Sequence, residues 1–295
     1  MNVYERLKEW RYGLYRVKGQ EINRLKFPEG VLLKLEPPEG CDTSMVEMQK
    51  ALYVLWYYPG RFSFEIWKDK GIEFFFFSSR KTAEGVLKSQ LEAVYPQVHI
   101  QRAEKNLPEI TPGEIIACSY LKLYGQELSL RCAEDFRRDP YHHIFGAIRN
   151  FQGKAMIQIL FEPLRRIPKD KLTIVAQKYG ITTRAPLFRC LIRIMVATGN
   201  EEAAKDGCDA ISTAFTVFDT GRTQLHPVSL SLSCPLINDP YQFLKKMNER
   251  RFSLLHKGFM ISVPELAALV HLPSEKIGGV QYHRVELEPP SYIEW

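Results

Sequence analysis

The chain has 295 residues, 45% of them hydrophobic, so it is long enough to bury ordinary globular cores. Forty Lys and Arg against 34 Asp and Glu give a formal net charge of +6, a mild excess that permits contact with DNA without the strong positive charge of a dedicated nucleic-acid binder. No apolar run approaches the roughly 20 residues that span a bilayer, and the six cysteines include no C-x-x-C pair. We therefore expect a cytoplasmic protein with no zinc ribbon, no disulfide framework and no membrane span, held at the inner face of a membrane, if at all, by a partner.

The N-terminal part of the chain leaves two interpretations open. Residues 2–15 combine positive side chains with aromatic and aliphatic ones, as an amphipathic helix does. Such a helix would lie on a partner or an anionic lipid surface, or it would pack on the protein's own core. Further on, Ser44 and Glu47 form a capping-box pattern, and the apolar residues after them predict a helix over residues 45–57.

Residues 62–101 have the most regular pattern in the chain. Apolar and polar residues alternate over 62–67 and again over 72–76, which predicts a hairpin turning at residues 68–71. Ser78 or Ser79 is a candidate N-cap for a helix that ends before Pro96, and alternation resumes at residues 98–100. The unit is predicted as strand, strand, helix, strand. Its run of four phenylalanines, residues 74–77, favours a strand buried on both faces over a base-stacking platform.

A related order of elements follows a polar connection at residues 106–113. Strands are predicted over 114–123 and 127–132, a helix from Asp139-Pro140 to about Phe151, and a strand over 155–161. Two such units indicate a degenerate ββαβ duplication. The predicted fold class is α+β, with two or three small domains of mainly antiparallel sheet and helices packed on one face. The domains would cover residues 1–110, 111–183 and 184–295.

The last part of the chain predicts a further α+β unit. Residues 163–186 are basic and bounded by proline, as in a linker with a short helix. A strand is predicted over 187–196, a helix over 201–212, and a strand or helix extension over 213–218. Alternation at residues 228–232 precedes predicted helices at about 240–256 and 264–271. The end of the chain is rich in proline and aromatic residues, which is typical of a segment that lies along a partner or leads into another domain.

The sequence lacks the common short motifs for catalysis and cofactor binding. The sequence has no P-loop, no G-x-G-x-x-G, no G-x-S-x-G elbow and no pair of histidines at metal-ligand spacing. Adjacent His142 and His143 would point to different faces of a helix. We therefore predict a protein that is not an enzyme and uses no cofactor or metal, although catalytic groups can also converge from distant positions.

Pairs of basic residues are the candidate nucleic-acid contacts. Contacts of this kind with phosphates would be independent of base sequence and sensitive to salt, whereas the alternative is ordinary solvated charge beside acidic neighbours. The candidates are Arg137, Arg138, Arg165, Arg166, Lys169, Lys171, Arg250 and Arg251.

Several segments, in order along the chain, resemble a known family. They are I-W-x-x-x-x-x-I-E-F (66–74), L-E-A-V-Y-P (91–96), D-P-Y-H-H-I-F-G-A-I (139–148), M-I-Q-I-L-F-E-P (156–163), F-R-C-L-I-R-I-M-V (188–196), A-I-S-T-A-F-T-V-F (210–218) and P-E-L-A-A-L-V-H-L-P (264–273). Together they resemble the N-terminal, pre-motor region of conjugative, type IV secretion-like ATPases of the HerA/FtsK superfamily, found in archaea and some bacteria. The last segment and Pro289-Pro290 carry the most specific part of the likeness.

The resemblance implies a role beside a DNA motor rather than a reaction. It covers residues from about 60 onward, and the family's P-loop motor would begin just after the likeness ends, so the sequence resembles a free-standing pre-motor region or a fragment of a longer chain. Gly153-Lys154 departs from the Gly-Glu that such proteins often have. The family's catalytic residues lie in the motor, so none is carried over.

Three hypotheses follow. The first is a non-enzymatic accessory module of a plasmid or virus-like mobile element that docks on a HerA/FtsK-type ATPase encoded on another chain. The second is a DNA-binding protein of the same element that binds without sequence specificity. The third is a cryptic enzyme such as a nuclease.

Overall fold

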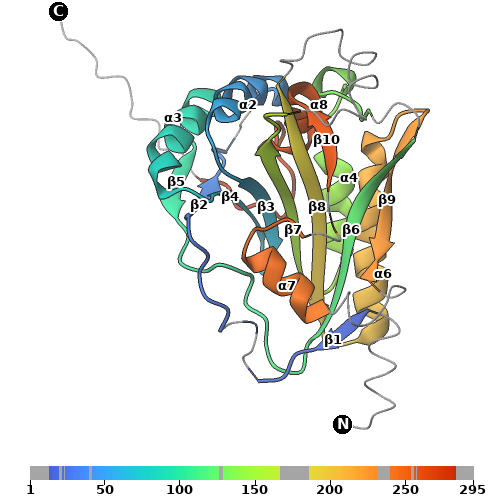
Figure 1. Cartoon of the computed structure of the whole chain (residues 1–295). Helices are drawn as coiled ribbons and strands as arrows, with labels where there is room; N and C mark the ends of the chain where they lie inside the picture. Colours follow the sequence, from blue (N-terminus) through green and yellow to red (C-terminus); the bar gives the residue numbers. More distant parts are fainter. Residues whose placement is uncertain are drawn as a thin grey trace, which may run out of the picture.

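A single ten-stranded antiparallel sheet organises the fold (Figure 1). The computed structural model describes residues 13–19, 22, 24–39, 42–125, 129–166, 186–230, 240–253, 256 and 258–283. The strand order is β1-β6-β8-β7-β3-β4-β2-β5, with β9 also paired to β6 and β10 to β8. The α+β class and the mainly antiparallel sheet are confirmed. The predicted division into domains stays a prediction. Each of the three proposed segments contributes strands to this one sheet.

The strands differ in length, and the longest lie in the middle of the sheet. They are β1 (Leu14–Arg16), β2 (Val31–Glu36), β3 (Phe62–Lys68), β4 (Ile72–Ser78), β5 (His99–Arg102), β6 (Ile115–Gly125), β7 (Lys154–Pro163), β8 (Leu187–Thr198), β9 (Thr223–Ser229) and β10 (Phe259–Ser262). β7 and β8 pair along nearly their whole length, from Lys154 opposite Ala197 to Pro163 opposite Phe188. These two strands form the centre of the sheet.

The predicted hairpin is confirmed as β3 and β4. Its strands pair from Phe62 opposite Ser78 to Lys68 opposite Ile72. The fourth element, β5, does not join the hairpin directly, because β2 lies between β4 and β5. β2 was missed in the sequence, where its residues follow a basic, aromatic stretch and precede a Pro/Glu-rich one.

The second predicted unit does not repeat the first. Residues 129–132 form no strand, so the predicted strand over 127–132 is wrong for its described part. The backbone N–H of Leu130 donates to the Glu265 carboxylate, and that of Arg131 donates to the Phe218 carbonyl, so this backbone is not bonded to β6. β9 pairs with β6 instead, from Ser119 opposite Ser229 to Gly125 opposite Thr223.

Most helices cover one face of the sheet. They are α2 (Met48–Tyr57), α3 (Glu84–Val94), α4 (Tyr141–Asn150), α6 (Glu201–Thr213) and α8 (Val263–Leu269), whose buried residues share one hydrophobic cluster with that face. α7 (Pro240–Asn248) packs on the opposite face, in a second cluster. In Figure 1, α7 lies in front of the sheet, with α4 and α6 behind it. The prediction of helices on one face therefore holds for all of these except α7.

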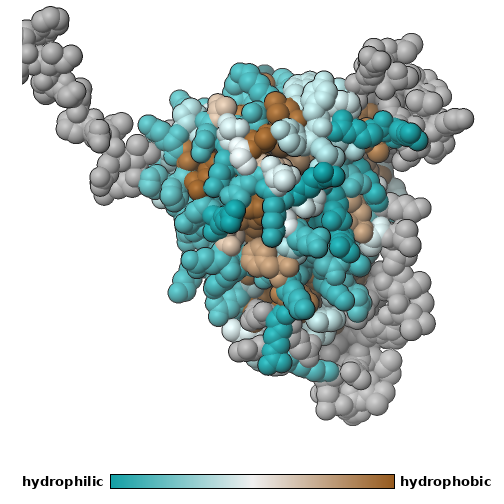
Figure 2. Space-filling model, turned by 60° about the vertical axis from the view of Figure 1, so that its left-hand side comes forward, coloured by the Kyte–Doolittle hydropathy of each residue, from teal (hydrophilic) through white to brown (hydrophobic). Residues whose placement is uncertain are grey.

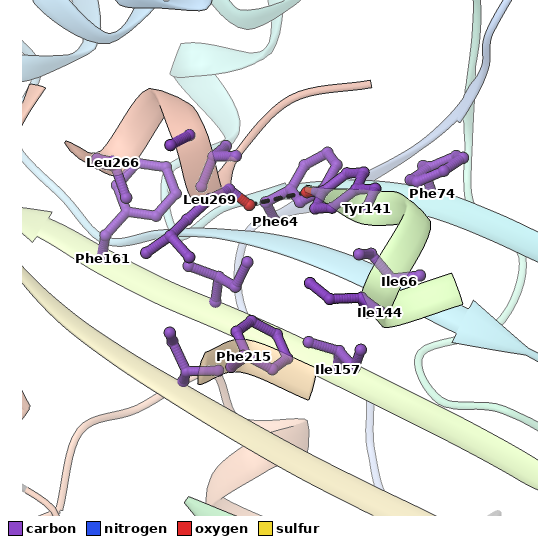
Figure 3. Packing of buried hydrophobic residues seen from close by; sticks show 14 of the residues in the cluster. Phe64, Ile66, Phe74, Tyr141, Ile144, Ile157, Phe161, Phe215, Leu266 and Leu269 are labelled. Atoms are coloured by element: carbon purple, nitrogen blue, oxygen red, sulfur yellow. Dashed lines mark hydrogen bonds between the residues drawn. The ribbon is translucent and has the colours of Figure 1, made fainter. Parts of the chain in front are cut away.

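The four phenylalanines of β4 are divided between the two faces, as predicted. Phe74 and Phe76 belong to the larger cluster and Phe75 and Phe77 to the smaller one. Figure 3 shows the larger cluster, in which Phe64, Phe74 and Ile157 of the sheet lie beneath residues of α4 and α8. The Tyr141 hydroxyl donates to the Leu269 carbonyl at 2.8 Å and so joins α4 to α8.

The ends of several elements differ from the prediction. Ser44 does begin a helical segment, since its hydroxyl accepts from the Val46 N–H at the start of a 3₁₀ turn, Met45–Glu47, that leads into α2. Neither Ser78 nor Ser79 is an N-cap, because the turn Lys81–Ala83 before α3 begins after Arg80, and Ser78 accepts from the Arg80 N–H instead.

Three further expectations about element types and ends are resolved by the structure. Leu14 and Tyr15 lie in β1 and pair with β6, so they do not extend an N-terminal helix, and the rest of residues 2–12 lies outside the described part. α7 ends at Asn248 rather than near residue 256, since Arg250 adopts a left-handed backbone with φ of 47°. The 3₁₀ turn Ala214–Phe218 makes residues 213–218 a helix extension, not a strand.

The β5 edge of the sheet carries polar side chains. β5 has the sequence HIQR, and three of its four residues are exposed. Figure 2, with the α3, β2 and β5 side turned forward, shows a mainly hydrophilic face with hydrophobic residues in separate patches. A short, polar edge strand resists pairing with the edge of another sheet.

A network of buried polar side chains occupies the face beneath α7. The Glu65 carboxylate accepts from Ser63, Trp67 and Gln158, and Arg250 donates to both of its oxygens at 2.9 and 3.0 Å. Arg193 donates to the Gln158 side chain and to the Arg251 carbonyl. The side chains of Glu65 and Arg250 are both 0% exposed.

This network holds more positive than negative charge. Arg250 is paired directly with Glu65, whereas the buried Arg193 guanidinium reaches this carboxylate only through Gln158. Burial lowers the pKa of Arg193 to about 9, against the opposing attraction of Glu65. A buried charge is tolerated only when it is paired, so the carboxylate is essential to this face of the sheet.

Replacing Glu65 by Gln should destabilise the protein strongly. The change leaves Arg250 and Arg193 buried without a counter-charge, a loss of about 3–5 kcal/mol in the free energy of unfolding. Urea unfolding at neutral pH measures it. Glu162→Gln is the matched control, because Glu162 pairs with Arg189 at 3.2 Å on partly exposed side chains. That change should cost no more than about 1 kcal/mol, and equal costs for the two variants would contradict the role given to Glu65.

Candidate nucleic-acid interface

A basic cleft lies where the chain enters α4. It encloses about 740 Å³ and is lined by Arg131, Phe136, Arg137, Arg138, Asp139, Pro140, His142, His143, Val217 and Glu275. The lining comes from residues 131–143, with one residue each from the turn after α6 and from the segment after α8. Three arginines and two histidines face two carboxylic residues, so the cleft has a positive character.

Arg131 and Phe136 form a rigid wall of the cleft. The Arg131 guanidinium lies 4.1 Å from the centre of the Phe136 ring, and it donates to the carbonyls of Asp135 and Val217 at 2.8 and 3.3 Å. Phe136 in turn packs edge to face against Phe218. The cation is held flat against an aromatic ring, as in many nucleic-acid sites.

Arg137 and Arg138 are the exposed cations of the cleft. Neither forms a hydrogen bond or an ion pair with another side chain in the part of the chain that the structure describes. Their positive charge is therefore not neutralised by an ion pair with a described side chain. An external anion would meet two solvated guanidinium groups, which bind phosphate oxygens well because each presents a fork of N–H donors.

Asp139 does not balance these arginines, because its carboxylate is used within the fold. One oxygen accepts from the Tyr141 N–H at 2.8 Å and contacts His271 Nε2 at 3.1 Å, and the other accepts from the N–H and hydroxyl of Ser274. Burial alone would raise the pKa of Asp139, but His271 and the two N–H donors outweigh burial and lower it to about 2. Asp139 therefore positions the α4 entry and the segment after α8.

The two histidines lie in the first turn of α4, and both are exposed. His142 contacts the Glu275 carboxylate at 3.1 Å. As adjacent residues they were expected to point to different faces of a helix, yet both line the cleft. Both histidines line the cleft because the turn at residues 133–139 brings Arg131 and Phe136 close to the start of α4. A pair of adjacent arginines within five residues of two histidines was the signal in the sequence for this grouping.

The structure places the other predicted contacts apart from this cleft. Arg165 lies 4.6 Å from the centre of the Trp56 ring, and Arg166 and Arg251 are exposed. The prediction that Arg250 contacts nucleic acid is wrong, because its side chain is fully buried and ion-paired to Glu65. Lys169 and Lys171 lie outside the described residues.

Metal ligands, membrane-spanning helices and reactive thiols would mark other kinds of site. Within the described ranges, no group of three or more His, Cys, Asp or Glu side chains is placed to hold a metal ion. Among those residues there is also no helix long and apolar enough to cross a membrane. Burial raises the pKa of the Cys208 thiol to about 12 and raises that of Cys118 well above its ordinary value, which makes both thiols poor nucleophiles.

Comparison with known proteins identifies a family. The family model described as "Domain of unknown function (DUF8128)" matches residues 43–186 and 169–284. These matches cover most of the chain, so the protein belongs to this family. No curated protein matches. A solved structure, "Crystal structure study of anthrone oxidase-like protein", is 11% identical and covers 70% of this chain and 94% of its own, with a TM-score of 0.20, too low to support a shared fold.

The carboxylate of Asp139 should make stability depend on acid pH. Its pKa is about 2 in the folded protein and about 4 in an unfolded chain, so its stabilisation is present above pH 4 and lost as the pH falls toward 2. The shift corresponds to about 2 kcal/mol. We expect Asp139→Asn to be less stable than the wild type at pH 7, with the difference shrinking between about pH 4 and 2. Unfolding in urea at a series of pH values measures this, and a difference that stays constant over that range would contradict it.

Proposed function

We propose that the protein is a non-enzymatic module of a DNA-transfer machine, and that it holds DNA by its phosphates at the cleft of residues 131–143. The observation that supports this best is the pair Arg137 and Arg138, which are exposed and have no side-chain partner among the described residues, beside Arg131 on Phe136 in a cleft of about 740 Å³. Contact through phosphates fits a protein that handles DNA of any sequence.

The acidic groups of the cleft favour binding over catalysis. Both oxygens of Asp139 are engaged by His271, Ser274 and Tyr141, so this carboxylate is poorly placed to activate a water or to hold a metal. Glu275 is partly engaged by His142. Because these two carboxylates already accept hydrogen bonds within the protein, a ligand in the cleft would interact mainly with the positively charged arginines.

The partner in this proposal is a HerA/FtsK-type ATPase encoded on another chain of the same mobile element. The support for it is the resemblance in sequence, whose segments at residues 66–74, 156–163, 188–196 and 264–273 form β3, β4, β7, β8 and α8. They lie in core elements, whereas β1, β2 and α2, which precede residue 60, lie outside the resemblance. Co-elution of the purified chain with such an ATPase tests the partnership, and separate elution at micromolar concentrations of both would argue against it.

Removing the two exposed arginines should weaken DNA binding and reduce its dependence on salt. Each phosphate contact contributes about 0.9 to the slope of log K against log salt for duplex DNA, so Arg137→Gln with Arg138→Gln should lower the slope by about 2. Fluorescence anisotropy of labelled duplex DNA, from about 50 to 300 mM salt, measures both the affinity and the slope. Both side chains are exposed, so folding should be unaffected.

The matched control removes two exposed positive charges elsewhere. Arg24→Gln with Lys26→Gln changes the net charge equally on the connection between β1 and β2. This variant should retain the wild-type slope. If both double variants lose affinity to the same extent, the contribution is net charge alone and the cleft is not the site. If the wild-type chain binds no DNA at the lowest salt, the proposed function is wrong.

A further inference from the structure

The outer face of α2 carries aromatic side chains that the core does not use. Tyr53 is 44% exposed and Tyr57 is 73% exposed. They stand four residues apart, so they lie on the same side of the helix with Cβ atoms about 5–6 Å apart. The inner face of α2, with Met48, Leu52 and Leu55, already packs into the larger hydrophobic cluster. The packing of α2 on the core therefore does not depend on these two tyrosines.

Trp56 and Arg165 extend this aromatic face. The Trp56 indole N–H donates to the Leu187 carbonyl at 3.1 Å, which fixes the ring against the start of β8. Its ring meets that of Tyr57 edge to face, with centres 5.2 Å apart. The Arg165 guanidinium lies over the Trp56 ring at 4.6 Å. The result is a pre-ordered surface of two tyrosines, a tryptophan and a flat cation.

The charges of α2 itself favour an anionic ligand, and the nearby Glu134 carboxylate accepts a hydrogen bond from Gln49 of the helix. The sequence of α2, MQKALYVLWY, contains no Asp or Glu. Just before it, Glu47 is paired with Lys50. Arg165 is exposed, and Arg166 beside it is exposed as well. An acidic polymer with flat, apolar parts would match both the aromatic rings and the arginines.

We propose that this surface, formed by Tyr53, Trp56, Tyr57, Arg165 and Arg166, is a binding site for single-stranded DNA. Unpaired bases stack on the tyrosines, and the two arginines contact the adjacent phosphates. Stacking on aromatic side chains is independent of base sequence because every base has a π face. Duplex DNA hides its base faces and gains nothing from the tyrosines. The inference rests on the proposed function and adds a second site that selects single strands.

The test compares single-stranded and duplex DNA of equal length. Tyr53→Ala with Tyr57→Ala should lower affinity for a labelled single-stranded oligonucleotide at least about tenfold, since each base stacked on an aromatic ring contributes severalfold or more. Affinity for duplex DNA should stay at the wild-type value. Tyr53→Phe with Tyr57→Phe keeps the rings and should bind single strands like the wild type. Both pairs of substitutions change exposed side chains of a helix, and circular dichroism verifies that the fold is kept.

A change on the ligand isolates stacking from phosphate contact. A single strand with abasic sites keeps its phosphates and lacks the bases at those positions. The wild type and the double Ala variant should bind it with the same weak affinity. A strand carrying 2-aminopurine should lose fluorescence on binding the wild type, because stacking quenches this base, and keep it with the Ala variant.

The outcomes separate this inference from the proposed function. If duplex binding depends on Arg137 and Arg138 while the Ala variant retains wild-type affinity for single strands, the proposed function stands and the α2 site is wrong. The exposed tyrosines then indicate a protein-docking face. If single strands bind through the tyrosines while Arg137→Gln with Arg138→Gln has no effect, the cleft is wrong and the α2 site stands. Absence of binding to either DNA overturns both.

Discussion

The ion pair between Glu65 and Arg250 is the interaction on which this fold depends. It joins β3 to the chain just after α7, and it balances part of the charge of Arg193, which lies on β8 beyond the intervening strand β7. Without the carboxylate, the face beneath α7 would enclose two cations among Phe77, Met156 and Leu160. Arg250 also donates to the carbonyls of Asn248 and Asn106, so one side chain fastens the end of α7 and the segment before β6. On this face, α7 and the following segment are therefore held to the sheet by buried polar contacts as well as by apolar packing.

The two faces of the sheet are stabilised differently, and the basic cleft lies on the side of the larger hydrophobic cluster. The larger cluster, under five helices, holds the sheet together by apolar packing, and the turn before α4 emerges from it with Arg137 and Arg138 exposed. Asp139 is the link, because its carboxylate joins the start of α4 to His271 and Ser274. The basic cleft therefore rests on buried hydrogen bonds rather than on a loose loop, which suits a site that must present its cations in a fixed arrangement.

Sequence patterns predicted the regular parts of this fold and missed what depends on distant partners. Alternation placed β3 and β4, and apolar runs rich in aliphatic residues placed β7 and β8, because their side chains face a core on at least one side. The same reasoning put a strand at residues 127–132, where the Leu130 N–H is instead taken by Glu265, 135 positions away. Arg250 resembled the other basic pairs, since nothing local distinguishes a guanidinium that will meet Glu65 from one that will meet solvent. Arg137 and Arg138 were predicted as a nucleic-acid contact because they are adjacent basic residues. The cleft that they line was not predicted, because Phe136 and His142 come together with them only when the turn before α4 folds.

The separation between Glu65 and Arg250 has a consequence for the order in which the molecule is completed. The two residues are 185 positions apart. During synthesis the β3–β4 hairpin emerges early, yet its carboxylate stays in water until Arg250 has been made, since no earlier arrangement supplies both guanidinium contacts. Each face of the sheet also lacks one of its covering helices until late, because α7 covers one face and α8, which follows residue 250, belongs to the cluster on the other. Long-range closure of this kind is slow, so a nascent chain that stalls before residue 250 would expose a half-finished sheet with polar residues at its centre.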